Sequence, residues 1–217
     1  NFRYRCEESL YIKENKIEVS EYFPLEWVKY LIGCRFETEK QNACAIYYFK
    51  RGMYVALDSR CESLLKNFFY YCDKLGKEYP RGDFIREFAT IKKEYLFRKT
   101  ELDNQALYEN QMKKAKALTF TDGNLIALIP TTTEEFLAEA NSQNNCVARM
   151  YMPRVIDNRT NIVFIRRVNN PEKSYITCEV RNGEIEQYLG KNNRWLYDDD
   201  EAMAFKKLFA KHLSQTW

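Results

Sequence analysis

One dipeptide, Asn182-Gly183, restricts the folds open to this chain more than any other feature. It separates two short segments rich in β-branched and aromatic residues, 175–180 and 185–189. A type I′ turn needs positive φ at both central residues, and Asn-Gly adopts it readily, so the two segments predict a β-hairpin. A third such segment, Asn161–Arg167, precedes them. We expect it to join the hairpin as an antiparallel meander.

Alternation along these strands predicts which side chains share a face of the sheet. The middle strand separates apolar from more polar residues, with Ile176, Cys178 and Val180 on one side and Tyr175, Thr177 and Glu179 on the other. Arg166 and Arg167 are neighbours in the first strand and therefore point to opposite faces. One of them should share a face with Glu179. Such an arginine–carboxylate pair is most often structural and contributes little when exposed.

The first half of the chain has the spacing of amphipathic helices. Apolar residues recur at helical intervals in three segments, Ser63–Lys77, Phe84–Tyr95 and Glu101–Lys116. Weak alternation in residues 1–20 predicts a short hairpin. The apolar runs Ala45–Phe49 and Met53–Leu57 fit either a second hairpin or part of a helix.

The character of the sequence changes after about residue 118, where turn residues and short strands begin. We therefore predict an α+β protein with two parts. Residues 1–118 form a mainly helical region with short hairpins, and residues 119–217 form an α+β module. The module is a small antiparallel β-meander with flanking helices.

Charge and cysteine content exclude several classes of protein. The net charge is only +3, so a polyanion-binding surface requires local segregation of charge. The seven cysteines form no CxxC pair, as expected of buried reduced thiols in the cytoplasm. A single histidine, His212, argues against zinc and against a serine or cysteine triad. We expect no metal, no cofactor and no membrane span, and the start without methionine or signal peptide suits a fragment.

Basic residues are concentrated around the predicted sheet. Between Cys146 and Arg181 there are seven basic and three acidic residues, and six of the seven are arginines. Arginine suits bidentate contact with phosphate, and the turn at Gly190–Arg194 can present backbone N–H groups to an anion. The predicted nucleic-acid-binding residues are Arg149, Arg154, Arg166, Arg167, Lys191, Asn192 and Arg194. DNA or RNA is the expected partner.

A catalytic reading uses residues from the same stretch. Glu179 would be the acid or base, Arg166 would stabilise charge, and Gln187 would orient the substrate together with Asn192. Cys146 adds a thiol near the start of the module. A third reading is a protein-interaction module, in which the aromatic helices over residues 63–97 dock a protein partner and no catalysis occurs.

Several short motifs occur in a recognisable order between residues 125 and 210. They are Asn145-Cys146-Val147, Tyr151, Val155, Ile162–Arg166, the Tyr-x-Thr-x-Glu run at 175–179, and Gln187–Asn193. In this order they resemble the PcfJ-like family. The resemblance implies a protein of bacterial conjugative elements or phages, and it implies no particular reaction. Similar family members carry histidine where this chain has Asn145, which weakens a cysteine-nucleophile mechanism.

Overall fold

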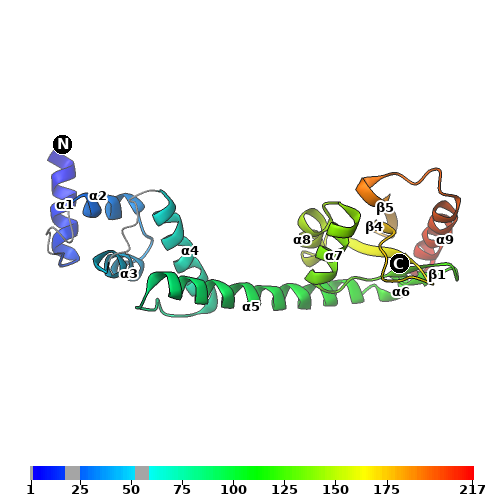
Figure 1. Cartoon of the computed structure of the whole chain (residues 1–217), viewed down its shortest axis with the longest axis horizontal. Helices are drawn as coiled ribbons and strands as arrows, with labels where there is room; N and C mark the ends of the chain where they lie inside the picture. The colour runs from blue at the N-terminus through cyan, green and yellow to red at the C-terminus, as the bar shows by residue number, and fades with distance from the viewer. Residues whose placement is uncertain (1, 18–24, 52–58) are drawn as a thin grey trace. The chain divides into compact units, whose positions relative to one another are not determined.

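The computed structural model describes residues 2–17, 25–51 and 59–217, with side chains from Glu8 on, Ser59 excepted (Figure 1). It divides into two compact units, Asn1–Arg98 and Lys99–Trp217. The division falls inside the long helix α5, Phe84–Met112, so the last turns of α5 pack with the second unit. The domain boundary near residue 118 stays a prediction.

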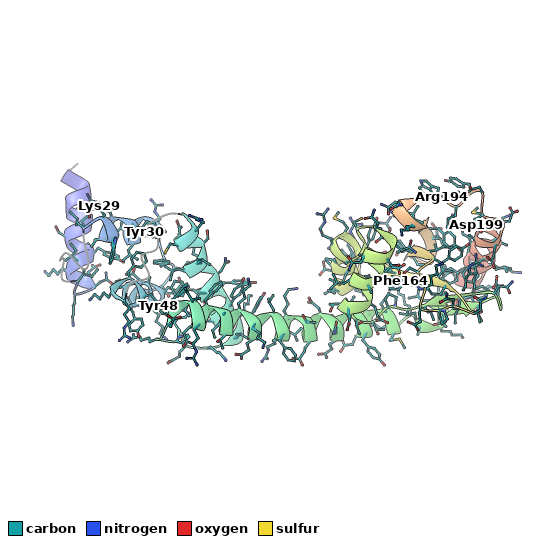
Figure 2. All side chains as sticks on the ribbon, in the orientation of Figure 1. Lys29, Tyr30, Tyr48, Phe164, Arg194 and Asp199 are labelled. Carbon is teal, nitrogen blue, oxygen red and sulfur yellow. The ribbon has the colours of Figure 1, made fainter. Side chains whose placement is uncertain are left out.

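The first unit is helical and is built around aromatic side chains. Its helices are α1 (Phe2–Glu14), α2 (Leu25–Cys34), α3 (Glu39–Lys50), α4 (Ser59–Leu75) and the first part of α5. Tyr48, which is labelled in Figure 2, and Phe68 are buried among other aromatic rings. The Tyr48 hydroxyl donates a hydrogen bond to the Pro80 carbonyl. Ile85 and Phe97 are exposed on α5. A protein partner for residues 63–97 stays a prediction.

The hairpin expected in residues 1–20 is wrong for Phe2–Glu14, which forms α1. Tyr11 and Ile12 are sequence neighbours that both pack against the core. In a strand, the side chains of these two neighbours would point to opposite faces. Because both pack against the same core, the segment forms a helix instead. Ala45–Phe49 lies in α3, and Met53–Leu57 lies outside the described residues.

The two helices expected over 84–95 and 101–116 are one continuous helix, α5, followed by the single turn α6 (Ala115–Leu118). No glycine or proline lies between Leu96 and Glu101 to end a helix there. Asp83 caps the start of α5, because its carboxylate accepts a hydrogen bond of 2.9 Å from the Arg86 N–H.

The second unit contains the predicted sheet. Five antiparallel strands follow in sequence order: β1 (Phe120–Thr121), β2 (Leu125–Leu128), β3 (Asn161–Arg167), β4 (Ile176–Arg181) and β5 (Glu184–Leu189). Asn182 and Gly183 both have positive φ, 53° and 81°, which confirms the turn between β4 and β5. The α+β class and the β-meander are therefore confirmed.

Helices cover both faces of this sheet (Figure 1). On one face α9 (Asp200–Thr216) and α6 pack on the apolar side of β3 and β4, with Phe205 and Phe209 fully buried. On the other face Phe136 of α7 (Thr133–Gln143) packs against β3 beside the π-helical turn η1 (Val147–Tyr151) and α8 (Met152–Ile156). Burial of each of these phenylalanine side chains stabilises the folded state by about 1.5–3 kcal/mol.

The threonine and glutamate spacing of residues 131–135 predicts a capping box at the start of a helix, and α7 begins there. Thr132 and Glu135 form a capping box, in which each side chain accepts the other's backbone N–H. At the other end Asn144 adopts φ 48°, and the chain then turns into η1. This ending brings residues 145–147 over the second face of the sheet, where they line a cleft.

Candidate functional site

The cleft is a cavity of about 200 Å³ on the α7-covered face of the sheet. Strands β3, β4 and β5 form its floor, and η1 and the turn η2 (Lys191–Asn193) contribute to its walls. The residues that line it are Asn145, Cys146, Val147, Tyr151, Ile162, Thr177, Glu179, Gln187, Leu189 and Asn193. The three predicted catalytic residues, Glu179, Cys146 and Gln187, thus come together from separate segments of the chain.

Strand register explains why these residues meet. Glu179 faces Ile162 on β3 and Gln187 on β5, so the three side chains form one row across the sheet. Thr177 faces Leu189 in the next row. The predicted alternation is therefore correct for Thr177 and Glu179, and it places a carboxylate in the floor of the cavity. It is wrong for Tyr175, which precedes β4 and packs against the core under α9.

Glu179 is a buried acid, with 6% of the residue exposed. Its Oε1 accepts a hydrogen bond of 2.9 Å from Thr160 Oγ1. No lysine or arginine is among the described residues that line the cavity. A buried carboxylate without a cation favours a ligand group that donates hydrogen bonds.

Gln187 and Tyr151 form the second polar pair of the cleft. Gln187 Nε2 donates a hydrogen bond of 2.7 Å to Tyr151 Oη. The Arg154 guanidinium lies 5.1 Å from the centre of the Tyr151 ring. This contact holds a cation outside the cavity, next to one of its walls.

Arg166 shares the face of Glu179 but pairs with a different acid. It binds both carboxylate oxygens of Glu139 on α7. Glu139 also accepts hydrogen bonds from Ser174 Oγ at 2.7 Å and from Thr177 Oγ1 at 2.8 Å. Both partners of the ion pair are buried. Arg166 therefore belongs to a structural network beneath α7 and does not line the cavity.

Asn145, which occupies the position where the resemblance implies a histidine, is also held in place. Its Nδ2 donates a hydrogen bond of 3.1 Å to Thr177 Oγ1, and its Oδ1 accepts one of 3.0 Å from the Val147 N–H. The side chain thus connects η1 to β4 on either side of Cys146. An amide cannot act as a base for the adjacent thiol.

Cys146 is partly exposed at the cleft, whereas Cys178 is fully buried on the other face of β4. Burial raises the pKa of the Cys178 thiol far above its ordinary value. We expect iodoacetamide at mildly alkaline pH to modify Cys146 more than tenfold faster than Cys178, because a raised pKa reduces the reactive thiolate about tenfold per unit.

Peptide mass spectrometry of the native chain measures both rates. In urea the two rates should converge, which serves as the control. Equal rates in the folded protein would show that Cys178 is not enclosed as described.

The predicted nucleic-acid-binding residues divide into two groups. Arg167 lies on the α9-covered face, where it pairs with Glu201 and lies 4.6 Å from the Tyr175 ring centre. Arg166 is buried as described above. The remaining four cations lie within three residues of lining residues in sequence, and we call them the cationic rim: Arg149, Arg154, Lys191 and Arg194.

Each rim cation is close to a lining residue. Arg149 lies in η1 between Val147 and Tyr151, and Lys191 and Arg194 flank Asn193. Arg194 pairs with Asp198 at the surface. The predicted residue Asn192 accepts a hydrogen bond of 2.8 Å from Asn144 Nδ2, which fixes η2 to the end of α7.

Sequence reasoning missed several residues of the cleft. Thr177 lies two positions before Glu179 on the same face of β4, so alternation alone could have identified it. Tyr151 and Asn193 belong to the motifs that resemble the family, but no periodicity places them at the cleft, because their positions depend on the π-helical turn and on positive φ in η2. In the described part of the chain, no helix has the length and apolar character to cross a membrane.

Comparisons with known proteins agree with the resemblance seen in the motifs. The sequence profile of PcfJ-like proteins matches residues 88–204. The uncharacterised protein Lin1253/Lin1744 of Listeria innocua is 33% identical over 96 residues, which are 44% of this chain and 21% of that protein. The chain thus spans about a fifth of this relative's length. No solved structure matches. Because the profile matches more than half of the residues of this chain, the chain belongs to the PcfJ-like protein family.

Proposed function

We propose that the second unit binds nucleic acid at the cleft, with phosphates on the cationic rim and a base edge in the cavity. One observation carries this proposal, namely the separation of charge around the cleft. The carboxylate of Glu179 lies inside, and four cations lie outside. A nucleotide has the complementary arrangement, because its phosphate is anionic and its base offers hydrogen-bond donors.

The interior of the cavity suits a base better than a phosphate. Glu179 repels an anion, while it accepts hydrogen bonds from amino groups such as cytosine N4–H₂. The volume of about 200 Å³ is below the ~300–1,000 Å³ of sites that enclose a drug-sized ligand. It is suited to one group of a larger molecule. Gln187 and Asn193 add amide groups that can pair with a base edge.

The rim supplies the sequence-independent part of binding. Its arginines can make bidentate phosphate contacts, and Lys191 adds a point charge. Arg149 and Lys191 have no ion-pair partner among the described residues. The family resemblance supports the same reading, since it implies a bacterial mobile element, where nucleic acid is the expected polyanion. The proposal therefore places this chain in such an element.

Salt dependence tests the rim. For a single-stranded oligonucleotide, four phosphate contacts predict a slope of about −3 in a plot of log affinity against log salt concentration. Lys191→Ala or Arg149→Ala should make the slope shallower by about 0.7, because each removes one phosphate contact. Fluorescence anisotropy with a labelled strand measures both quantities.

Lys211→Ala is the matched control, since Lys211 is exposed on α9, which covers the opposite face. It should leave the slope unchanged. A wild-type affinity that does not respond to salt would remove the electrostatic basis of the proposal.

A second candidate is an enzyme that acts on nucleic acid or a nucleotide. The observation that favours it is the buried Glu179 carboxylate in the same cavity as the Cys146 thiol. Glu179 would transfer a proton, and Gln187 would orient the reacting group. The charge-stabilising role first considered for Arg166 does not fit, because Glu139 occupies its guanidinium.

A further inference from the structure

Two aromatic side chains lie exposed beside the cleft. Trp195 and Tyr197 are 51% and 72% exposed. Their rings are nearly parallel, with 5.6 Å between centroids and 8° between planes. They belong to the segment between η2 and α9, whose ends are marked by Arg194 and Asp199 in Figure 2. We call Trp195 and Tyr197 the aromatic pair.

The segment that carries the aromatic pair is fixed at three points. Leu196 points the other way, packs against the core under α9 and touches Gly190, where an added Cβ would lie 3.1 Å from it. At one end the Gly190 N–H donates a hydrogen bond of 3.0 Å to the Arg194 carbonyl. At the other end Asp199 caps α9 and accepts a hydrogen bond of 2.6 Å from Tyr175 Oη. The pair is thus held outward by a rigid segment.

The aromatic pair extends the cleft face of the sheet. Trp195 forms an antiparallel bridge with Leu189, and Leu189 faces Thr177 on β4. Side chains of residues that face each other in an antiparallel pair point to the same side. Trp195 therefore lies on the side of Thr177 and Glu179, next to Leu189 and Asn193, which line the cavity. The stacked contact between the two rings keeps Tyr197 beside Trp195.

We infer that the aromatic pair stacks an unpaired base of a single-stranded nucleic acid whose neighbouring base enters the cleft. The inference rests on the proposed function and names its substrate as a single strand. Exposed rings next to cations are the combination by which single-strand binders hold bases and backbone together. Lys191 supplies a cation close to this segment, whereas the charge of Arg194 is shared with Asp198.

A duplex does not fit this arrangement. Its stacked, paired bases expose no face to the two rings, and their edges lie within the grooves, where a narrow cavity cannot enclose them. A protein partner would bury the same rings, yet it would need neither Lys191 nor the polar cavity beside them. Asp198 neutralises Arg194, whereas Lys191 has no ion-pair partner among the described residues. That unpaired cation favours a polyanion with aromatic groups. A single strand has both properties along its whole length.

The test compares three probes of the same sequence in fluorescence anisotropy with the full chain: a single strand, its duplex, and an abasic strand with the same phosphates. The wild type should prefer the single strand. Trp195→Ala and Tyr197→Ala should each weaken single-strand binding about 5- to 150-fold, the range for loss of one stacked base. Neither change should affect the abasic strand, because its phosphates still meet the rim.

Matched variants separate stacking from folding. Trp195→Phe keeps an aromatic ring and should retain most of the affinity. Tyr108→Ala removes an aromatic of similar exposure, 57%, on α5 and should have no effect.

Two results would overturn the inference in different ways. If the alanine variants bind the single strand as tightly as the wild type while Lys191→Ala weakens binding, the rim binds phosphate but the aromatic pair does not stack a base. If no probe binds the wild type, the proposed function fails together with the inference.

Discussion

Replacing Arg166 by methionine should lower the free energy of unfolding of the second unit by about 3–5 kcal/mol. The change leaves the Glu139 carboxylate buried between α7 and the sheet without its cation. The hydrogen bonds from Ser174 and Thr177 remain, but two hydroxyl groups do not replace a bidentate guanidinium. Native-state hydrogen exchange of the β3 and β4 amides measures the loss within the intact chain.

The next residue in the strand provides the control. Arg167 also pairs with a glutamate, but its side chain is 45% exposed and that of Glu201 is 35% exposed. Arg167→Met should cost at most about 1 kcal/mol, because water solvates the remaining carboxylate. Adding Glu139→Leu to Arg166→Met should recover part of the stability, since the unpaired buried charge is then gone. Equal losses for the two arginines would show that Glu139 is not enclosed.

The same pair of arginines shows how far sequence reasoning reaches. Alternation correctly predicted that Arg166 and Arg167 point to opposite faces and that one of them shares the face of Glu179. The structure shows that this one is Arg166. Alternation could not identify Glu139 as the partner of Arg166. Glu139 lies in α7, 27 residues away in sequence, and only tertiary packing brings the two together.

Local signals were reliable where one or two residues decide the backbone. Asn182-Gly183 predicted the hairpin, and the threonines and glutamates at 131–135 predicted the start of α7. The cleft could be predicted only in part. Its floor follows from strand alternation, whereas its walls depend on a π-helical turn and on two asparagines with positive φ, Asn192 and Asn193. No periodicity in the sequence reports such backbone geometry.

Glu179→Gln should discriminate between binding and catalysis at the cleft. If Glu179 accepts a hydrogen bond from a base amino group, the variant should bind an oligodeoxycytidine of about ten nucleotides about 5- to 150-fold more weakly. Binding of an oligothymidine of the same length should change little, because thymine has no amino group. The rim still meets the phosphates of both strands, so the difference between them reports the cavity alone.

The control is Glu184→Gln, which removes an exposed carboxylate from the same hairpin and lies outside the cleft. It should leave both affinities unchanged. Thr160→Val should act in the direction of Glu179→Gln with a smaller effect, because it removes the hydrogen bond that positions the carboxylate.

Catalysis gives a different pattern in the same experiment. If Glu179 transfers a proton, Glu179→Gln should retain affinity for a strand that the wild type converts, while turnover falls about 10²- to 10⁴-fold. Gel analysis of the labelled strands after incubation measures that conversion. If affinity for both strands survives and neither protein converts either one, Glu179 neither reads a base nor moves a proton. The buried acid would then serve only to hold Thr160, and the proposed contact between Glu179 and a base would be wrong.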